Sequence, residues 1–121
     1  MAFADTITIT INSVAKVLNR INQDQYSSEY FLRGTLDEFR LKIRHSSYTN
    51  QSTGKLTDRH NVELVQTVYP VSPAVVSTVR KAYSVLENER PDGVTEPLNF
   101  DLGFAAFFTS ANITKLLNYE S

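Results

Sequence analysis

EFRLKIRHSS, residues 38–47, alternates between apolar and cationic side chains, and this alternation determines how the rest of the chain is interpreted. Successive side chains of a β-strand point to opposite faces of a sheet, so the segment is predicted to be a strand with two unlike faces. One face carries the apolar residues Phe39, Leu41 and Ile43. The other face carries the cations Arg40, Lys42 and Arg44. Neighbouring like charges repel, so we expect this face to meet an anionic partner.

The composition indicates one small globular domain. The chain has 121 residues, of which 41% are hydrophobic. Because the net charge is only −1, any affinity for nucleic acid must come from where the charges lie. The absence of cysteine excludes disulfides, Cys-zinc sites and thiol nucleophiles. Residues 104–108, the longest apolar run, are too short to cross a bilayer, and no secretion signal is visible, so we expect a soluble intracellular protein.

Alternation elsewhere predicts further strands. TITITI, residues 6–11, followed by a two-residue turn at Asn12-Ser13, predicts a hairpin over residues 6–22, although VAKVLNRI in its second arm also fits a short helix. The other predicted strands are residues 29–33, 38–47, 59–69 and 75–88. A polar loop is predicted over residues 47–58, and a turn with two prolines over residues 70–73.

Two helices are predicted to close the chain. Thr95 is a candidate N-cap for the first, with Pro97 near its start, and Ser110 for the second. Strands followed by helices indicate an α+β fold in a single domain, residues 1–121. Its parts are the N-terminal β-hairpin (1–24), the antiparallel sheet (29–90) and the two helices (94–119).

The helices are too small to cover the apolar face of such a sheet. The first is also phenylalanine-rich, through Phe100, Phe104, Phe107 and Phe108, and requires burial on more than one side. Both requirements are met if two copies pair their sheets edge to edge and each lends its helices to the other. The sequence therefore predicts an obligate homodimer.

Neighbouring strands extend the cationic face. Residues with the same alternation as the cations, and so candidates to bind RNA with Arg40, Lys42 and Arg44, are Arg59, Asn61, Lys81, Tyr83 and Glu87. The arginines and lysines would contact phosphates, and Tyr83 would stack on an unpaired base. A solvated sheet surface is the alternative interpretation of the cations.

Candidate catalytic and metal sites are weak. His45, Ser46 and Asp58 or Asp37 would make a Ser-His-Asp arrangement, but no nucleophile motif supports it, and adjacent residues of a strand face opposite ways. A hydrolase using His45 is kept only as a third hypothesis, and His60 is interpreted as a structural hydrogen-bonding residue. No spacing resembles a metal site or a nucleotide-binding loop, so no cofactor, metal, catalytic residue or small-molecule substrate is predicted.

The chain resembles the coat proteins of the small single-stranded RNA bacteriophages, the leviviruses. The segments that carry the resemblance are EFRLKIRHSS, RHNVELVQTVYP (59–70), TVRKAYSVLEN (78–88) and NFDLGFAAFFTSANITKLLNYES (99–121). With the N-terminal hairpin they cover nearly the whole chain. Their order and spacing match the order of elements predicted above.

The resemblance implies a hairpin, a five-stranded antiparallel sheet and two helices that interlock with a partner subunit. It implies dimers that assemble in the bacterial cytoplasm into an icosahedral virion capsid, typically T=3, with genomic RNA stem-loops, including a translational operator, bound on the inner sheet face. Arg40 and Lys42 occupy positions where the family has small hydroxyl residues of an adenine pocket. A dimeric RNA-binding repressor that forms no shell is the alternative.

Overall fold

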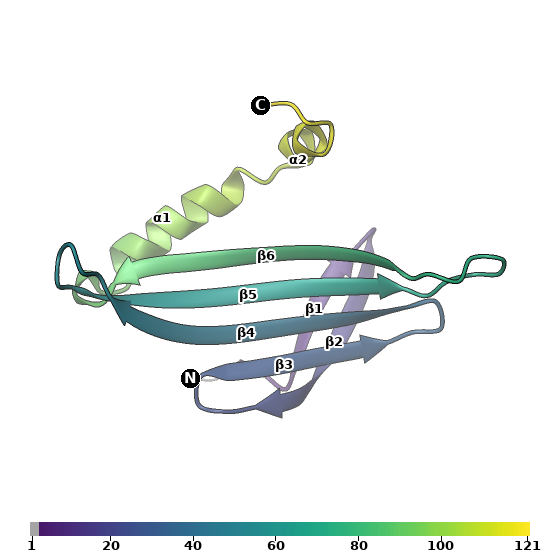
Figure 1. Ribbon diagram of the computed structural model, residues 1–121, viewed down its shortest axis with the longest axis horizontal. Helices are drawn as coiled ribbons and strands as arrows, with labels where there is room; N and C mark the ends of the chain where they lie inside the picture. The colour runs from purple at the N-terminus through teal and green to yellow at the C-terminus, as the bar shows by residue number, and fades with distance from the viewer. Residues whose placement is uncertain (1–2) are drawn as a thin grey trace.

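The computed structural model describes residues 3–121 as one antiparallel sheet followed by two helices (Figure 1). The α+β class is confirmed, but the strand count differs: the hairpin and four further strands form one six-stranded sheet, in chain order, instead of a hairpin beside five strands. The strands are β1 (Thr6–Ile11), β2 (Val14–Gln23), β3 (Ser27–Arg33), β4 (Asp37–Thr49), β5 (Leu56–Val68) and β6 (Thr78–Glu89). A 3-10 turn, η1 (Arg90–Asp92), precedes α1 (Thr95–Ala106) and α2 (Ser110–Leu117). Residues 1–2 of the predicted hairpin unit 1–24 lie outside the described residues.

The N-terminal hairpin is confirmed, and its second arm is a strand, not a helix. Asn12 and Ser13 have φ angles of 55° and 64°, and Ile11 pairs with Val14 across them. Two consecutive positive φ angles are those of the type I′ turn, whose twist matches that of the flanking strands. Pairing with the β-branched residues of β1 therefore holds residues 14–19 extended, and β3 pairs with the rest of β2.

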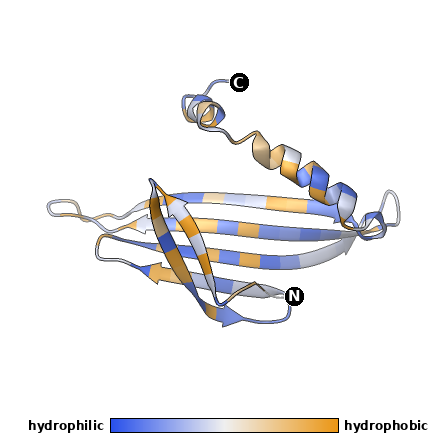
Figure 2. Ribbon diagram, turned by 180° about the vertical axis from the view of Figure 1, so that it is seen from behind, coloured by the Kyte–Doolittle hydropathy of each residue, from blue (hydrophilic) through white to orange (hydrophobic). Residues whose placement is uncertain are grey.

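A β-bulge turns the hairpin across the sheet. The pairing of β2 with β3 shifts by one residue between Arg20 and Asn22, and an extra residue bends a strand and increases its twist. Figures 1 and 2 show β1 and β2 crossing one face of the long strands. The hairpin thereby covers part of the face that carries Phe39, Leu41 and Ile43.

The core lies between the hairpin and that face. Its buried members are Leu18, Tyr30, Phe39, Leu41 and Ile43. Ile7, Ile9 and Ile11 pack against them from β1, as the alternation predicts. The hydroxyl of Tyr30 donates a hydrogen bond to the carbonyl of Ala4 at 2.7 Å, so the polar end of this buried ring is satisfied.

The long central strands extend further than predicted. β4 and β5 pair residue for residue from Asp37↔Val68 to Thr49↔Leu56, which shortens the predicted loop of residues 47–58 to residues 50–55. The loop prediction was wrong because polarity was taken as the sign of a loop. Main-chain pairing does not require apolar side chains where both faces of a strand are open to water.

Both predicted helix caps were wrong by one residue. Thr95 is the first helical residue and Val94 precedes it, without a side-chain cap. Ser110 is likewise the first residue of α2, and the hydroxyl of Thr109 accepts the bond from the Asn112 amide at 3.3 Å. In the pair Thr109-Ser110 both side chains are good caps, so composition alone does not choose between them.

The helices project past the β6 edge and away from their own sheet (Figure 1). Neither helix has a buried residue. Their connection to the sheet is fixed at η1, where Arg90 donates three hydrogen bonds of 2.7–3.2 Å to the carboxylate of Asp58 on β5. This bidentate pair holds the point from which α1 departs.

Replacing Leu18 tests the core. Leu18→Ala leaves a cavity in the core cluster and is expected to lower the free energy of unfolding by about 3 kcal/mol, measured by urea denaturation. The control is Val17→Ala on the exposed side of the same strand, where we expect a loss below about 1 kcal/mol. Equal losses in the two variants would contradict this assignment of the core.

The Asp58–Arg90 pair predicts an acid-dependent loss of stability. The hydrogen bond from Arg90 holds the pKa of the Asp58 carboxyl below its usual range. A carboxyl whose pKa is lower in the folded than in the unfolded protein stabilises the fold when the pH is above its unfolded-state pKa. This stabilisation is lost as the pH falls, here below about pH 4. Asp58→Asn should therefore show a flatter decline of unfolding free energy between pH 5 and pH 3. The control is Asp92→Asn, which removes a carboxylate from η1, the turn that carries Arg90, and should keep the slope of the original protein.

Candidate RNA-binding face

The strand register places all eight predicted RNA-binding residues on one face of the sheet. This face, called the cationic face, is the side of β3–β6 opposite the buried core. It carries Arg40, Lys42, Arg44, Arg59, Asn61, Lys81, Tyr83 and Glu87. The register of β5 against β4 and β6 brings them together: Arg44 pairs with Asn61, Arg59 with Glu87, and Val65 lies between Arg40 and Lys81.

Carboxylates alternate with the cations across this face. In register, Lys42 lies between Glu29 of β3 and Glu63 of β5, and Glu63 is followed by Tyr83 of β6. Cationic strand residues on the face are Arg33, Arg40, Lys42, Arg44, Arg59 and Lys81, and acidic ones are Glu29, Glu38, Glu63, Glu87 and Glu89. Six positive and five negative side chains leave a local surplus of one positive charge, although the whole chain is slightly acidic.

Three of the arginines form ion pairs across strands. Arg40 pairs with Glu29, Arg44 with Glu63 at 3.5 Å, and Arg59 with Glu87 at 3.8 Å. The side chains of Arg44 and Arg59 are about half exposed, at 53% and 48%. Exposed pairs of this kind contribute little to stability, roughly 0–1 kcal/mol. A phosphate group can therefore replace the carboxylate partner at small cost to the fold.

An aromatic residue that sequence analysis missed belongs to the same face. The guanidinium groups of Arg40 and Arg33 lie 4.8 Å and 5.4 Å from the ring centre of Phe31. The alternation in EYFLR, which puts Tyr30 in the core and Phe31 on the other side, is the signal that would have found it. Phe31 on β3 and the exposed Tyr83 on β6 place π-faces on both outer strands of the cationic face.

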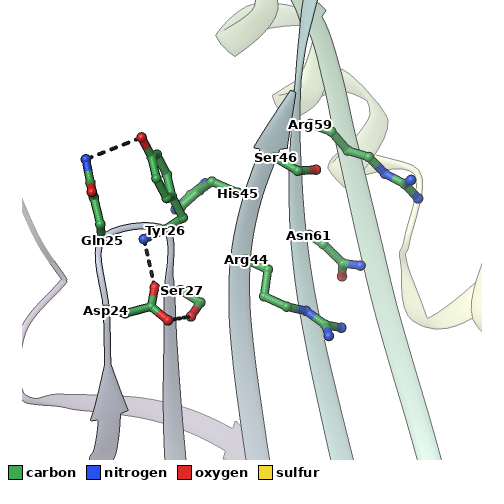
Figure 3. Close-up of a pocket in the computed structure, with 9 residues that line it drawn as sticks. All are labelled: Asp24, Gln25, Tyr26, Ser27, Arg44, His45, Ser46, Arg59 and Asn61. Atoms are coloured by element: carbon green, nitrogen blue, oxygen red, sulfur yellow. Dashed lines mark hydrogen bonds between the residues drawn. The ribbon is translucent and has the colours of Figure 1, made fainter. Parts of the chain in front are cut away.

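A shallow pocket of about 610 Å³ lies at one end of the cationic face, beside the turn between β2 and β3 (Figure 3). The strands line it with Arg44, His45, Ser46, Arg59 and Asn61. The turn contributes Asp24, Gln25, Tyr26 and Ser27, which sequence analysis did not single out. This pocket combines two guanidinium groups with hydroxyl and amide groups, which is the chemistry of a nucleotide-binding surface.

Asp24 holds the turn in shape. Its carboxylate accepts hydrogen bonds from the Tyr26 amide at 2.9 Å and the Ser27 hydroxyl at 2.8 Å. The Ser27 hydroxyl, and after it the Tyr26 amide, lower the pKa of the Asp24 carboxyl below its ordinary value. An aspartate that accepts a hydrogen bond from the backbone amide two residues later is typical of a tight turn. The aspartate of DQYS, residues 24–27, is therefore the sequence signal that would have indicated this turn.

Asn61 leaves an unused acceptor in this pocket. Its Oδ1 atom is buried and accepts no hydrogen bond from the residues that the structure describes. An unpaired buried acceptor costs free energy that a suitable donor recovers. The nearest cation in register is Arg44, whose guanidinium instead contacts Glu63.

The Ser-His-Asp arrangement that sequence analysis disfavoured is not assembled. His45 lies on the opposite face from Ser46, and its Nδ1 atom is 2.8 Å from Nδ1 of His60. The hydrogen-bonding role predicted for His60 is thereby confirmed. Within residues 3–121, no group of three or more histidine, aspartate or glutamate side chains is arranged to hold a metal ion. None of the helices in this range is long and apolar enough to cross a membrane.

Comparison with known proteins gives a family and a fold. The family described as phage phiCb5 coat protein matches residues 4–89. A solved structure, the virus-like particle of Beihai levi-like virus 21, superposes with a TM-score of 0.71 over 99% of this chain and 98% of that one, at 13% identity. No curated protein sequence matches. At this identity the structural match shows a shared fold, whereas the family match spans well over half of the sequence, so the chain belongs to the phage phiCb5 coat protein family.

Proposed function

We propose that this coat protein builds an icosahedral shell from interlocked homodimers and binds genomic RNA stem-loops on the cationic face. Family membership makes it a structural component of a virion, not an enzyme. One observation carries the RNA proposal: eight residues chosen from three separate strands lie on a single face, opposite the face that the hairpin covers.

The helices support the dimer. Apolar side chains occur all around α1, and exposed ones include Leu98, Phe100, Leu102 and Phe104. A helix with apolar side chains on more than one side requires burial on more than one side, and its own sheet does not provide it. The partner with the required chemistry is a second copy, whose uncovered apolar sheet face would receive α1.

The open edge of the sheet provides the geometry for this exchange. β6 is the last strand of the sheet, so a twelve-residue strand has one row of unpaired backbone groups. Such an edge is a template for pairing with another chain. Pairing two β6 edges antiparallel would make one continuous sheet, and each pair of helices, which already projects past β6, would then lie over the partner.

The ion pairs support selective binding of RNA. A phosphate competes with Glu29, Glu63 and Glu87 for the arginines, so single contacts are weak and several must form together. Phe31 and Tyr83 offer surfaces on which unpaired bases stack. A stem-loop presents closely spaced phosphates and unpaired bases in one compact unit, which fits this combination better than a duplex.

Assembly is tested by placing a charge on α1. The protein expressed alone should give uniform shells with nucleic-acid absorbance, recorded by size exclusion, negative-stain electron microscopy and absorbance at 260 and 280 nm. Phe104→Asp should abolish them, because a carboxylate cannot be buried in the dimer without a partner. Asn99→Asp adds the same charge to the same helix at an exposed polar position and should still assemble. Dimers that never form shells would favour the repressor alternative.

RNA binding is tested by removing one cation from each side of the sheet. Arg44→Ala should weaken RNA binding and lower the slope of log K against log salt by about one unit, measured by fluorescence anisotropy with a short RNA stem-loop. Arg80→Ala is the matched control, because Arg80 pairs in register with Gln66 on the opposite face. An unchanged slope for Arg44→Ala, or an equal change for both variants, would overturn the assignment of the face.

A further inference from the structure

The free edge of the sheet carries a cation and a carboxylate toward opposite ends of β6. Lys81 and Glu87 both lie on the cationic face. Lys81 is opposite Val65 of β5, and it belongs to none of the ion pairs among the described residues. Glu87 contacts Arg59 only at 3.8 Å, close to the limit of an ion pair. Both charges are therefore available to a second chain at this edge.

Symmetry restricts how two β6 edges can meet. A two-fold axis makes the contact reciprocal, so that if one residue faces a second residue of the partner, the second faces the first. Opposite residues of an antiparallel pair point to the same face of the sheet, so odd-numbered residues oppose odd-numbered ones and even oppose even. One residue must then lie on the axis, opposite its own copy. The choice of this residue fixes the whole register.

Starting from the homodimer proposed above, we infer that Ser84 lies on the two-fold axis and that Lys81 forms an ion pair with Glu87 of the partner subunit. Residues 79–89 of each copy are then paired. With Ser84 opposite itself, the pairs across the axis are Val79 with Glu89, Arg80 with Asn88, Lys81 with Glu87, Ala82 with Leu86, and Tyr83 with Val85.

This register joins side chains of matching chemistry at every pair except the outermost, Val79 with Glu89. Opposite charges, and an aromatic beside a β-branched residue, are favourable cross-strand pairs, which describes Lys81 with Glu87 and the pair next to the axis. On the other face an alanine meets a leucine, and the guanidinium of Arg80 meets an amide oxygen that can accept its hydrogen bonds. Symmetry makes each of these pairs occur twice in the dimer.

Moving the axis to Tyr83 removes these matches. Lys81 would face Val85 of the partner subunit, and Arg80 would face the partner subunit's Leu86. Both cations would then lie opposite hydrocarbon, where a charge loses water without gaining an acceptor.

Moving the axis to Val85 gives Lys81 a less suitable partner. Lys81 would face Glu89, whose carboxylate is already engaged by Lys55 of its own chain at 3.0 Å. The paired segment would also shorten from residues 79–89 to residues 81–89, because Glu89 is the last residue of the strand. The register centred on Ser84 therefore combines a longer pairing with a more loosely held carboxylate.

Single cysteines identify the residue on the axis. The chain has no cysteine, so an introduced thiol reports on one position only. Directly opposite Cα atoms are about 4.5–5.5 Å apart, a separation that a disulfide spans. Ser84→Cys, oxidised with copper phenanthroline, should therefore give a covalent dimer on a non-reducing gel. Ala82→Cys, an equally small residue on the same face, would lie more than about 13 Å from its copy and should not link.

Tyr83→Cys and Val85→Cys report the two neighbouring registers. More efficient linking at either position, or at Ala82→Cys, than at Ser84→Cys would overturn the inference and leave the β6–β6 homodimer in place. If no position links although size exclusion shows dimers, the two β6 edges do not pair and the inference fails with them. Monomers in size exclusion would instead contradict the homodimer of the proposed function.

A double variant tests the ion pair on the opposite face from Ser84. Lys81→Cys combined with Glu87→Cys in one chain should give covalent dimers, because these positions face each other across the axis. Within one chain they lie about 20 Å apart along the strand, so no internal disulfide can form. Each single variant is the matched control and should not link. A double variant that stays unlinked while Ser84→Cys links would overturn the Lys81–Glu87 pair.

Discussion

The alternation of β4 is the constraint on which the rest of the structure depends. Phe39, Leu41 and Ile43 are buried by the hairpin, and burying them fixes which way every other side chain of the strand points. A shift of one residue would exchange the faces, exposing this core and burying Arg40, Lys42 and Arg44. The apolar face therefore fixes the position of the cations, and residue-for-residue pairing with β5 transmits that choice to the next strands.

The parts of the fold that alternation defines were predictable from sequence. The hairpin, the order of the strands and the two helices agree with the structure because β-branched alternation and helical spacing are local signals. The extension of β4 and β5 through residues 47–58 was not predictable, since it depends on pairing between polar segments. The choice of cap at Thr109 and the bulge near Ile21 depend equally on backbone geometry that composition does not specify.

The candidate site shows the same division. The alternation of side chains along each strand was enough to choose residues of one face on β4, β5 and β6. The same alternation in β3 would have placed Phe31 on that face. The carboxylate partners of the arginines and the contribution of the turn at Asp24 come from the lateral register of strands, which no single segment reveals. The pairing of His45 with His60 has the same origin, because fifteen residues separate them.

The mixed charge of the cationic face has a consequence for the contents of a particle. Its strands offer a surplus of only one positive charge for each chain, because five carboxylates offset six cations. If the cationic face lines a particle that packages RNA, as proposed, the genome brings one negative charge per nucleotide, and the face leaves most phosphates uncompensated wherever nucleotides outnumber this surplus. Mobile counterions, such as polyamines or magnesium, must then enter with the RNA, and the internal pressure of a filled particle would depend on them more than on the protein.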